Sequence, residues 1–171
     1  MEARAKLFGH PIHQMLIVLP LGLLAGAVLF DVLSLVLGGD DWRVVAYWLI
    51  PAGVATGLLA AVFGLIDWAT IPRATRAKRV GLVHGAGNVL VVALFIGSWL
   101  LRGDATAQPS VLAYALSFAG GGLSMLTGWL GGELVNRLGV GVDDGAHLDA
   151  PSSLSGRPAS DTVPRRRTTT A

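Results

Sequence analysis

The chain contains no cysteine, and this absence removes several kinds of chemistry at once. Disulfides, thiolate metal sites, thiol redox reactions and cysteine-ligated iron–sulfur clusters are all excluded. Charged residues are scarce as well: they make up 14% of the 171 residues, whereas a soluble domain usually carries about a quarter. The net charge is only +2, which is too small to indicate binding to nucleic acid. The composition therefore favours neither an ordinary soluble domain nor a nucleic-acid-binding protein.

Four long windows of the sequence are almost free of charge. Asp31 is the only charged residue between Gln14 and Gly39, and the windows 44–66, 80–101 and 105–132 contain none. A helix needs about 20 apolar residues to cross a hydrocarbon core of roughly 30 Å, and lipid offers no partners to any other backbone conformation. We therefore predict an all-α integral membrane protein. Its four transmembrane helices form an up-down-up-down bundle, with approximate spans 14–37, 44–66, 80–101 and 111–135.

The positions of Lys and Arg predict the orientation of this bundle. Eleven of the thirteen lie in the N-terminal segment, in the loop between the second and third spans, or in the C-terminal region. Arg43 and Arg102 are the two on the opposite side. Because Lys and Arg favour the cytoplasmic side, we expect both termini to be cytoplasmic. The expected location is the plasma or inner membrane of the cell, crossed several times, with the lipid bilayer as the main partner.

The composition changes at Asp143. Pro, Ser, Thr, Asp, Gly and Arg dominate from there on, and such a segment cannot bury enough apolar surface to offset the entropy of ordering it. The sequence thus predicts a four-helix transmembrane domain over residues 1–142 and a disordered cytoplasmic tail over residues 143–171.

Polar residues interrupt the apolar spans mainly at one end of the predicted bundle. His13 lies at the start of the first span and His84 lies inside the third. Asp67 closes the second span and Glu133 closes the fourth. Each helical hairpin therefore begins with a histidine and ends with a carboxylate, which suggests an internal duplication. We expect these four side chains to converge at the cytoplasmic end of the bundle.

The residues around the two histidines predict where the first helix begins and which side chains share a face of the third. Proline is favoured in the first turn of a helix, so Pro11 should place His10 before the helix and His13 within its first turn. His84 and Asn88 are four residues apart and share one helical face. The small residues 85–87 leave room beside them for another helix or a flat ligand. Ionisable residues within spans are functional candidates by default.

Each of these residues also has a structural interpretation. Glu133 could pair with Arg137 four residues later, and Asp67 with Arg73 or Arg76 in the following loop. Asp31 lies roughly 27 Å along the helix from His13, near the other surface, and is interpreted as a structural partner of Arg43 or Arg102.

Taken in order, these motifs resemble the bacterial domain-of-unknown-function family 2231. The resemblance covers roughly residues 7–142. It rests on Gly9-His10-Pro11-Ile12-His13, Gly64-Leu65-Ile66-Asp67-Trp68, His84 with Asn88, and Gly131-Gly132-Glu133-Leu134-Val135 followed by Gly139-Val140-Gly141-Val142. The family comprises small predicted membrane proteins without an established activity, and fusion of some relatives to Rieske-type redox domains implies an association with electron transfer. This chain departs from the family pattern at Gln14, where proline is usual, and at Leu138, where histidine is frequent.

Three functions are compatible with these residues. The first is a haem- or metal-binding, redox-associated subunit, with His13, His84, His10 and Asn88 around a b-type haem, or His13, His84, Asp67 and Glu133 around a transition metal. The second is a structural or assembly subunit without a ligand, and the third is a small proton-coupled transporter. A redox partner or a homo-oligomer is compatible with the first two. Because the sequence has no nucleophile elbow, phosphate loop or HExxH motif, an enzyme is not favoured.

Overall fold

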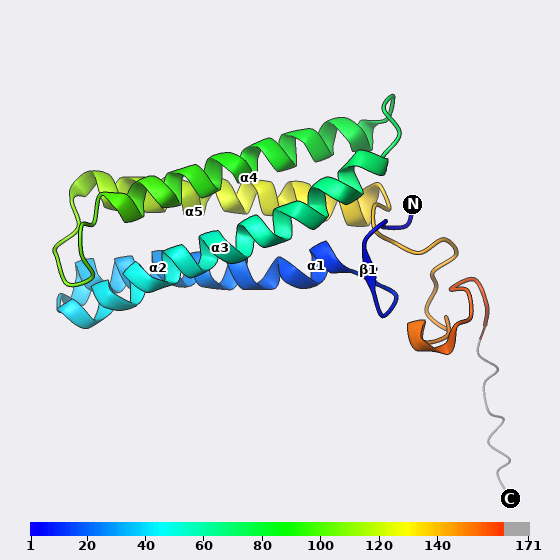
Figure 1. Cartoon of the computed structure of the whole chain (residues 1–171), viewed down its shortest axis with the longest axis horizontal. Helices are drawn as coiled ribbons and strands as arrows, with labels where there is room; N and C mark the ends of the chain where they lie inside the picture. Colours follow the sequence, from blue (N-terminus) through cyan, green and yellow to red (C-terminus); the bar gives the residue numbers. More distant parts are fainter. Residues whose placement is uncertain (163–171) are drawn as a thin grey trace, which may run out of the picture.

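The computed structural model describes residues 1–162 of the chain, and helices dominate it (Figure 1). A small antiparallel pair of strands, β1 and β2, precedes the helices. The elements in order are β1 (Lys6–Leu7), β2 (His10–Pro11), α1 (Ile12–Leu16), α2 (Val18–Leu37), α3 (Asp40–Thr70), α4 (Arg76–Leu100), α5 (Val111–Gly132), a π-helical turn η1 (Glu133–Arg137) and a 3₁₀ turn η2 (Ser153–Ser155).

The prediction of four membrane-spanning helices is confirmed. Four helical stretches are long and apolar enough to cross a membrane: Ile12–Leu37, Asp40–Thr70, Arg76–Leu100 and Val111–Arg137. Asp40–Thr70 and Arg76–Leu100 extend up to four residues beyond the predicted spans 44–66 and 80–101, because those two spans were limited to the charge-free windows. A helix can continue through charged residues once it has left the hydrocarbon core, as α3 does at its acidic first turn, Asp40 and Asp41.

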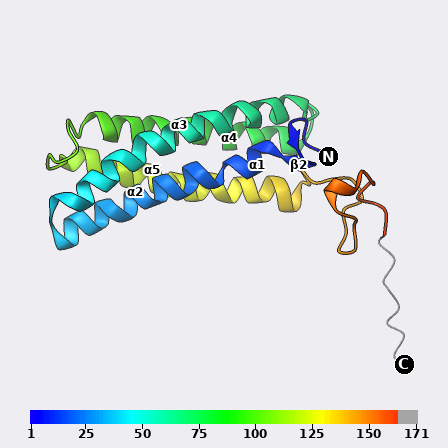
Figure 2. The ribbon, with the colours of Figure 1, turned by 60° about the horizontal axis from the view of Figure 1, so that its bottom comes forward.

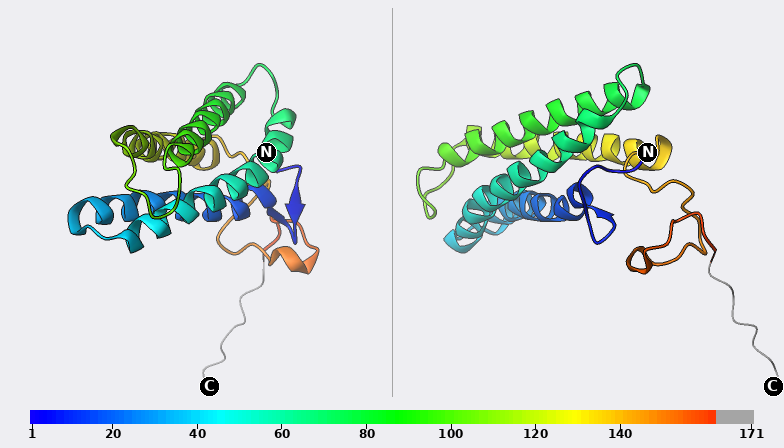
Figure 3. Two further views of the ribbon diagram at one scale, coloured as in Figure 1. Left: turned by 60° about the vertical axis from the view of Figure 1, so that its left-hand side comes forward. Right: turned by 45° about the vertical axis from the view of Figure 1, so that its right-hand side comes forward.

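The helices form two hairpins that pack side by side (Figures 1 and 3). In the first hairpin α1 and α2 pack along α3, and in the second α4 packs along α5. Contacts between α3 and α4 and between α2 and α5 join the hairpins, which places α2 and α4 diagonally across the bundle. One end, called here the basic end, carries the N-terminus, the loop 71–75 and the C-terminal segment (Figures 1 and 2). The far end carries the two hairpin turns.

The first membrane-spanning helix is interrupted at Ile17, between α1 and α2. Pro20 follows three residues later and has no N–H to donate to the carbonyl of Leu16, so the regular hydrogen-bond ladder cannot run through this point. Two bonds still cross the interruption, from Ile17 N to His13 O (3.1 Å) and from Leu21 N to Ile17 O (3.1 Å). α1, which carries His13, therefore continues into α2 with one hydrogen bond of the helical ladder missing.

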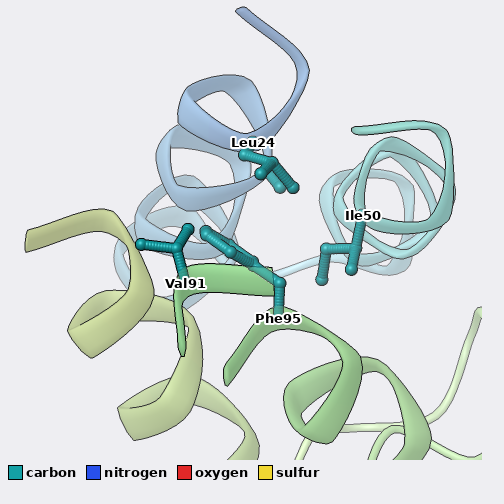
Figure 4. Close-up of a cluster of buried hydrophobic side chains, with 5 residues drawn as sticks. Leu24, Ile50, Val91 and Phe95 are labelled. Atoms are coloured by element: carbon teal, nitrogen blue, oxygen red, sulfur yellow. The ribbon is translucent and has the colours of Figure 1, made fainter. Parts of the chain in front are cut away.

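The core lies where the diagonal helices meet. Leu24 and Ala27 of α2, Ile50 of α3, and Val91 and Phe95 of α4 form one buried cluster. In Figure 4 the Phe95 ring extends toward the helix that carries Leu24 and lies beside Val91. Many other large apolar side chains are exposed, because lipid is the solvent for the outer faces of such a bundle.

The two hairpins can be aligned residue by residue with one constant offset for their first helices and another for their second helices, which supports the expected duplication. His13 and His84 differ by 71 in residue number, and so do Asp31 and Arg102. On the second helix of each hairpin the difference is 67, and it aligns Gly53 with Gly120, Tyr47 with Tyr114 and Gly64 with Gly131. In this register Asp67 corresponds to Leu134, so the predicted equivalence of Asp67 and Glu133 is wrong by one residue.

Helix contacts repeat in the same register. A Cβ placed on Gly53 would lie 2.6 Å from Leu24, and one placed on Gly120 would lie 2.9 Å from Phe95, the residue that corresponds to Leu24. Leu49 comes within 3.2 Å of the Cβ position of Gly26, and Leu116 comes equally close to that of Gly97. Each hairpin is therefore closed by the same pattern of large side chains seated on glycines.

The part of the C-terminal segment that the structure describes consists of turns and η2. It contacts the N-terminal strands: the Ser153 hydroxyl lies 3.3 Å from Nε2 of His10. The disorder expected for residues 143–171 stays a prediction, and its last nine residues lie outside the described part of the chain.

Candidate functional site

His13 lies in the first turn of the short helix α1, as predicted. Pro11 was expected within that turn, but it is the extended residue immediately before the helix. Its Nδ1 is 2.8 Å from the carbonyl oxygen of Ala60 on α3. The ring rests on Gly64, one turn further along α3, where a Cβ would come within 2.8 Å of its Cε1 atom. A glycine is needed at this position because any side chain would occupy the space of the imidazole.

His84 repeats this arrangement in the second hairpin. Its Nδ1 is 2.8 Å from the carbonyl oxygen of Thr127 on α5. The Cβ position of Gly131, again four residues after the accepting residue, lies 3.3 Å from Cε1 of the ring. The two imidazoles are thus held in equivalent places, each on the first membrane-spanning helix of its hairpin.

The hydrogen bonds determine the tautomer of both neutral rings. A backbone carbonyl can only accept, so Nδ1 must carry the proton in each histidine. Nε2 is then the nitrogen with a free lone pair. This is the form in which an imidazole ligates a metal, and a carbonyl bound to the other nitrogen is the usual support for such a ligand.

Asn88 joins His84 to the neighbouring helix α5. Its Oδ1 accepts a hydrogen bond from the Thr127 hydroxyl (3.1 Å), and its Nδ2 donates to the backbone carbonyl of His84 (2.9 Å). The same Nδ2 lies 3.3 Å from Nε2 and 3.5 Å from Nδ1 of the His84 ring. The predicted proximity of Asn88 to His84 is therefore present, and Thr127 belongs to the same group.

Asp67 is used to anchor the N-terminal segment. Its Oδ1 accepts hydrogen bonds from the backbone amides of Arg4 (2.8 Å) and Ala5 (3.0 Å), and neither Arg73 nor Arg76 pairs with it. Nearby, hydrogen bonds to Asp143 and then to Glu2 raise the pKa of the Lys6 ammonium above its usual value. Asp67 thus stabilises a cap of residues 1–11 over the basic end.

Glu133 forms an ion pair across the second hairpin. Its Oε1 lies 2.7 Å from a guanidinium nitrogen of Arg76 at the start of α4. The expected partner was Arg137, four residues later, but η1 begins at Glu133 and has the wider turn of a π-helix. Residues four apart no longer stack on one face there, so Arg76 from the neighbouring helix takes that place.

The predicted four-ligand metal cluster is not assembled. Within residues 1–162, no three side chains among histidine, aspartate and glutamate lie close enough together to hold a metal ion. Asp67 is engaged with the N-terminal amides and Glu133 with Arg76. His10 is exposed beside Ser153. The structure places Asn88 beside His84, and it places His13 in the equivalent position of the first hairpin.

A second polar group lies at the far end, where Asp31 and Arg102 form a fully buried ion pair. Both guanidinium NH groups contact the carboxylate, at 2.8 and 2.7 Å, and the two side chains are 0% and 1% exposed. Arg102 also donates to Ser98 (3.2 Å). Of the two partners expected for Asp31, Arg43 and Arg102, the structure pairs it with Arg102.

Sequence reasoning missed the polar residues that surround this pair. Ser34 shares a hydrogen bond with the hydroxyl of Tyr114 (2.8 Å), and Ser98 donates to the carbonyl of Ala113 (2.7 Å). A signal was present in the sequence: Asp31 and Arg102 each lie 18 residues beyond the histidine of their hairpin. That equal spacing places the two charges at the same depth.

Comparisons with known proteins agree with this architecture. No curated protein and no solved structure matches the chain. A family model described as predicted membrane protein (DUF2231) matches residues 9–144, which include both histidines, all four long helices and the Asp31–Arg102 pair. The chain therefore belongs to this family of predicted membrane proteins.

Proposed function

We propose that the protein binds a b-type haem between His13 and His84 and acts as an electron-transfer subunit in the membrane. The observation that carries the proposal is the repeated imidazole geometry. Each ring gives its Nδ1–H to a backbone carbonyl at 2.8 Å, which leaves Nε2 as the nitrogen that can ligate a metal. In His84 the Asn88 amide lies 3.3 Å from Nε2 and would have to move aside for a ligand. Helical bundles place such sites between facing helices.

The number of available ligands favours haem over a bare metal ion. Zinc and similar ions usually need three or four protein ligands, whereas a porphyrin supplies four nitrogens and leaves only axial positions to the protein. Residues 1–162 offer a pair of histidines here and no larger ligand group. A bound haem would supply one-electron chemistry, which agrees with the redox association implied by the resemblance.

The residues around His84 also suit a flat ligand. Gly85 follows it in the sequence, and nothing lies within 4 Å of the Cβ position of Gly85. His84 itself is partly buried between α4 and α5.

The test is an absorption spectrum of the full chain, purified in detergent from cells supplied with a haem precursor. We expect one low-spin haem per chain, because two imidazoles give a six-coordinate iron. His84→Ala should lose this haem. The matched control is His147→Ala, since His147 is exposed and contacts Asp161 in the C-terminal segment. A wild-type chain that takes up no haem, even when titrated with hemin, contradicts the proposal.

The orientation in the membrane is part of the same proposal. We expect the basic end to face the cytoplasm, because Arg73, Arg76, Lys78 and Arg79 all lie in or next to its loop. Reporter fusions at Arg76 and Ser155 should then be cytoplasmic, and those at Asp41 and Asp104 external. The reverse pattern, or two fusions at the same end that disagree, would refute this orientation. The plasma or inner membrane is the proposed location, and residues 1–142 are the proposed membrane domain.

A further inference from the structure

The two histidines occupy equivalent positions but have different surroundings. In the register that aligns the hairpins, Asn88 corresponds to Ile17 and Thr127 corresponds to Ala60. The second hairpin therefore has an amide and a hydroxyl beside its imidazole where the first has apolar side chains. This difference makes the two rings unequal as ligands.

His84 is held firmly. It lies two turns inside the continuous helix α4, and Nδ1 bonds to the carbonyl of Thr127. Asn88 adds a bridge, because it bonds at once to the backbone of His84 and to the hydroxyl of Thr127. The amide nitrogen of Asn88 also lies against the ring. These contacts restrict rotation of the ring and its separation from α5.

His13 is held less firmly. Within residues 1–162, the bond from Nδ1 to the carbonyl of Ala60 is the only hydrogen bond of its ring. It belongs to α1, a helix of five residues, and the interruption at Ile17 separates α1 from α2. Pro20 has no N–H to donate to the carbonyl of Leu16, so the helix is weakened close to His13. Ile17, which corresponds to Asn88, is apolar and cannot form a hydrogen-bonded bridge.

We propose that His84 is the permanent ligand of the site and His13 the replaceable one, so that the site can admit a small external ligand on the His13 side. Ligands of the appropriate class are diatomic gases, such as carbon monoxide, and small nitrogen bases, such as imidazole. This inference rests on the proposed function, since it concerns the same histidine pair. It makes the site a place where a small molecule binds, in addition to one where electrons pass.

The experiment compares His13→Ala and His84→Ala in the full chain, loaded with haem in cells. His13→Ala should keep at least half of the wild-type haem content, change to a high-spin spectrum, bind carbon monoxide after reduction, and return to a low-spin spectrum when imidazole is added. His84→Ala should keep less than a tenth. Equal losses in the two variants, or retention by His84→Ala alone, would overturn the inference. A wild-type chain without haem would overturn the proposed function instead, so the two failures are distinguishable.

A second comparison tests the bridge that is responsible for the difference. In the His13→Ala background, Thr127→Val removes the hydroxyl while keeping a similar shape, and Thr127→Ser keeps the hydroxyl. The Val variant should lose haem several-fold more readily than the Ser variant when apomyoglobin is added as a haem acceptor. The same rate of loss from both would show that the bridge through Asn88 does not hold His84 in place.

Discussion

Arg102→Met is expected to lower the free energy of unfolding by about 3–5 kcal/mol, because it leaves the Asp31 carboxylate buried without a counter-charge. In the native protein both oxygens of Asp31 accept hydrogen bonds from Arg102, and neither side chain reaches solvent. A lone ionised group at this depth is costly in a membrane protein. The measurement is reversible unfolding in mixed detergent micelles, followed by circular dichroism.

Two variants serve as controls for this effect. Arg43→Met breaks an ion pair with Asp40 at the same end of the bundle, but the Asp40 side chain is 65% exposed, so the expected cost is at most about 1 kcal/mol. The double variant Asp31→Leu/Arg102→Met removes both charges and should recover most of the lost stability. If Arg102→Met cost no more than Arg43→Met, the buried pair would not be a stabilising contact between the hairpins.

Gly64→Val should have the second large effect, because it forces His13 out of its place. The new Cβ alone would lie 2.8 Å from Cε1 and 2.9 Å from Nδ1 of the imidazole, and the two branching methyl groups would need further space. The ring would have to rotate and lose its bond to the carbonyl of Ala60. We expect a loss of roughly 1–3 kcal/mol in the free energy of unfolding, typical of overpacking.

The matched control is Gly85→Ala, since nothing lies within 4 Å of its Cβ position. This change should be neutral or stabilise the helix by up to about 1 kcal/mol, because alanine has the higher helix propensity. In haem-loaded protein, Gly64→Val should also reproduce the high-spin spectrum expected of His13→Ala. Unchanged stability and spectrum would mean that the imidazole does not rest on Gly64.

The helices could be predicted from the sequence because their cause is local. Charge-free windows of 20 or more residues must be helical in lipid, and all four were found within a few residues of their true ends. The interruption at Ile17 was not predicted. Pro20 removes one backbone hydrogen bond, but the sequence does not show which residue of the helix will be displaced as a result. The N-terminal strands were missed because they are two residues long and depend on the cap that Asp67 anchors.

The candidate site could be predicted only in part. His13 and His84 were identified because ionisable residues are rare inside spans, and the structure places them in equivalent sites. The carboxylates were expected beside them because they lie at the same end of the bundle, but nearness along the membrane normal does not determine a partner. Arg76 and the amides of Arg4 and Ala5 compete for Glu133 and Asp67, and competition between distant segments leaves no local signal.

The contact between Asp31 and Arg102 joins equivalent positions of the two hairpins, and this has a consequence for how the hairpins can pair. Residues in equivalent positions of two related hairpins can touch only close to the pseudo-two-fold axis that relates the hairpins. In a dimer of identical hairpins the residue at this position would face the same residue of the other hairpin. Aspartate would then face aspartate, or arginine would face arginine. An acid facing a base requires two independently varying sequences. An ion pair on the axis is therefore a contact that two identical hairpins could not form, and it ties the first hairpin specifically to the second.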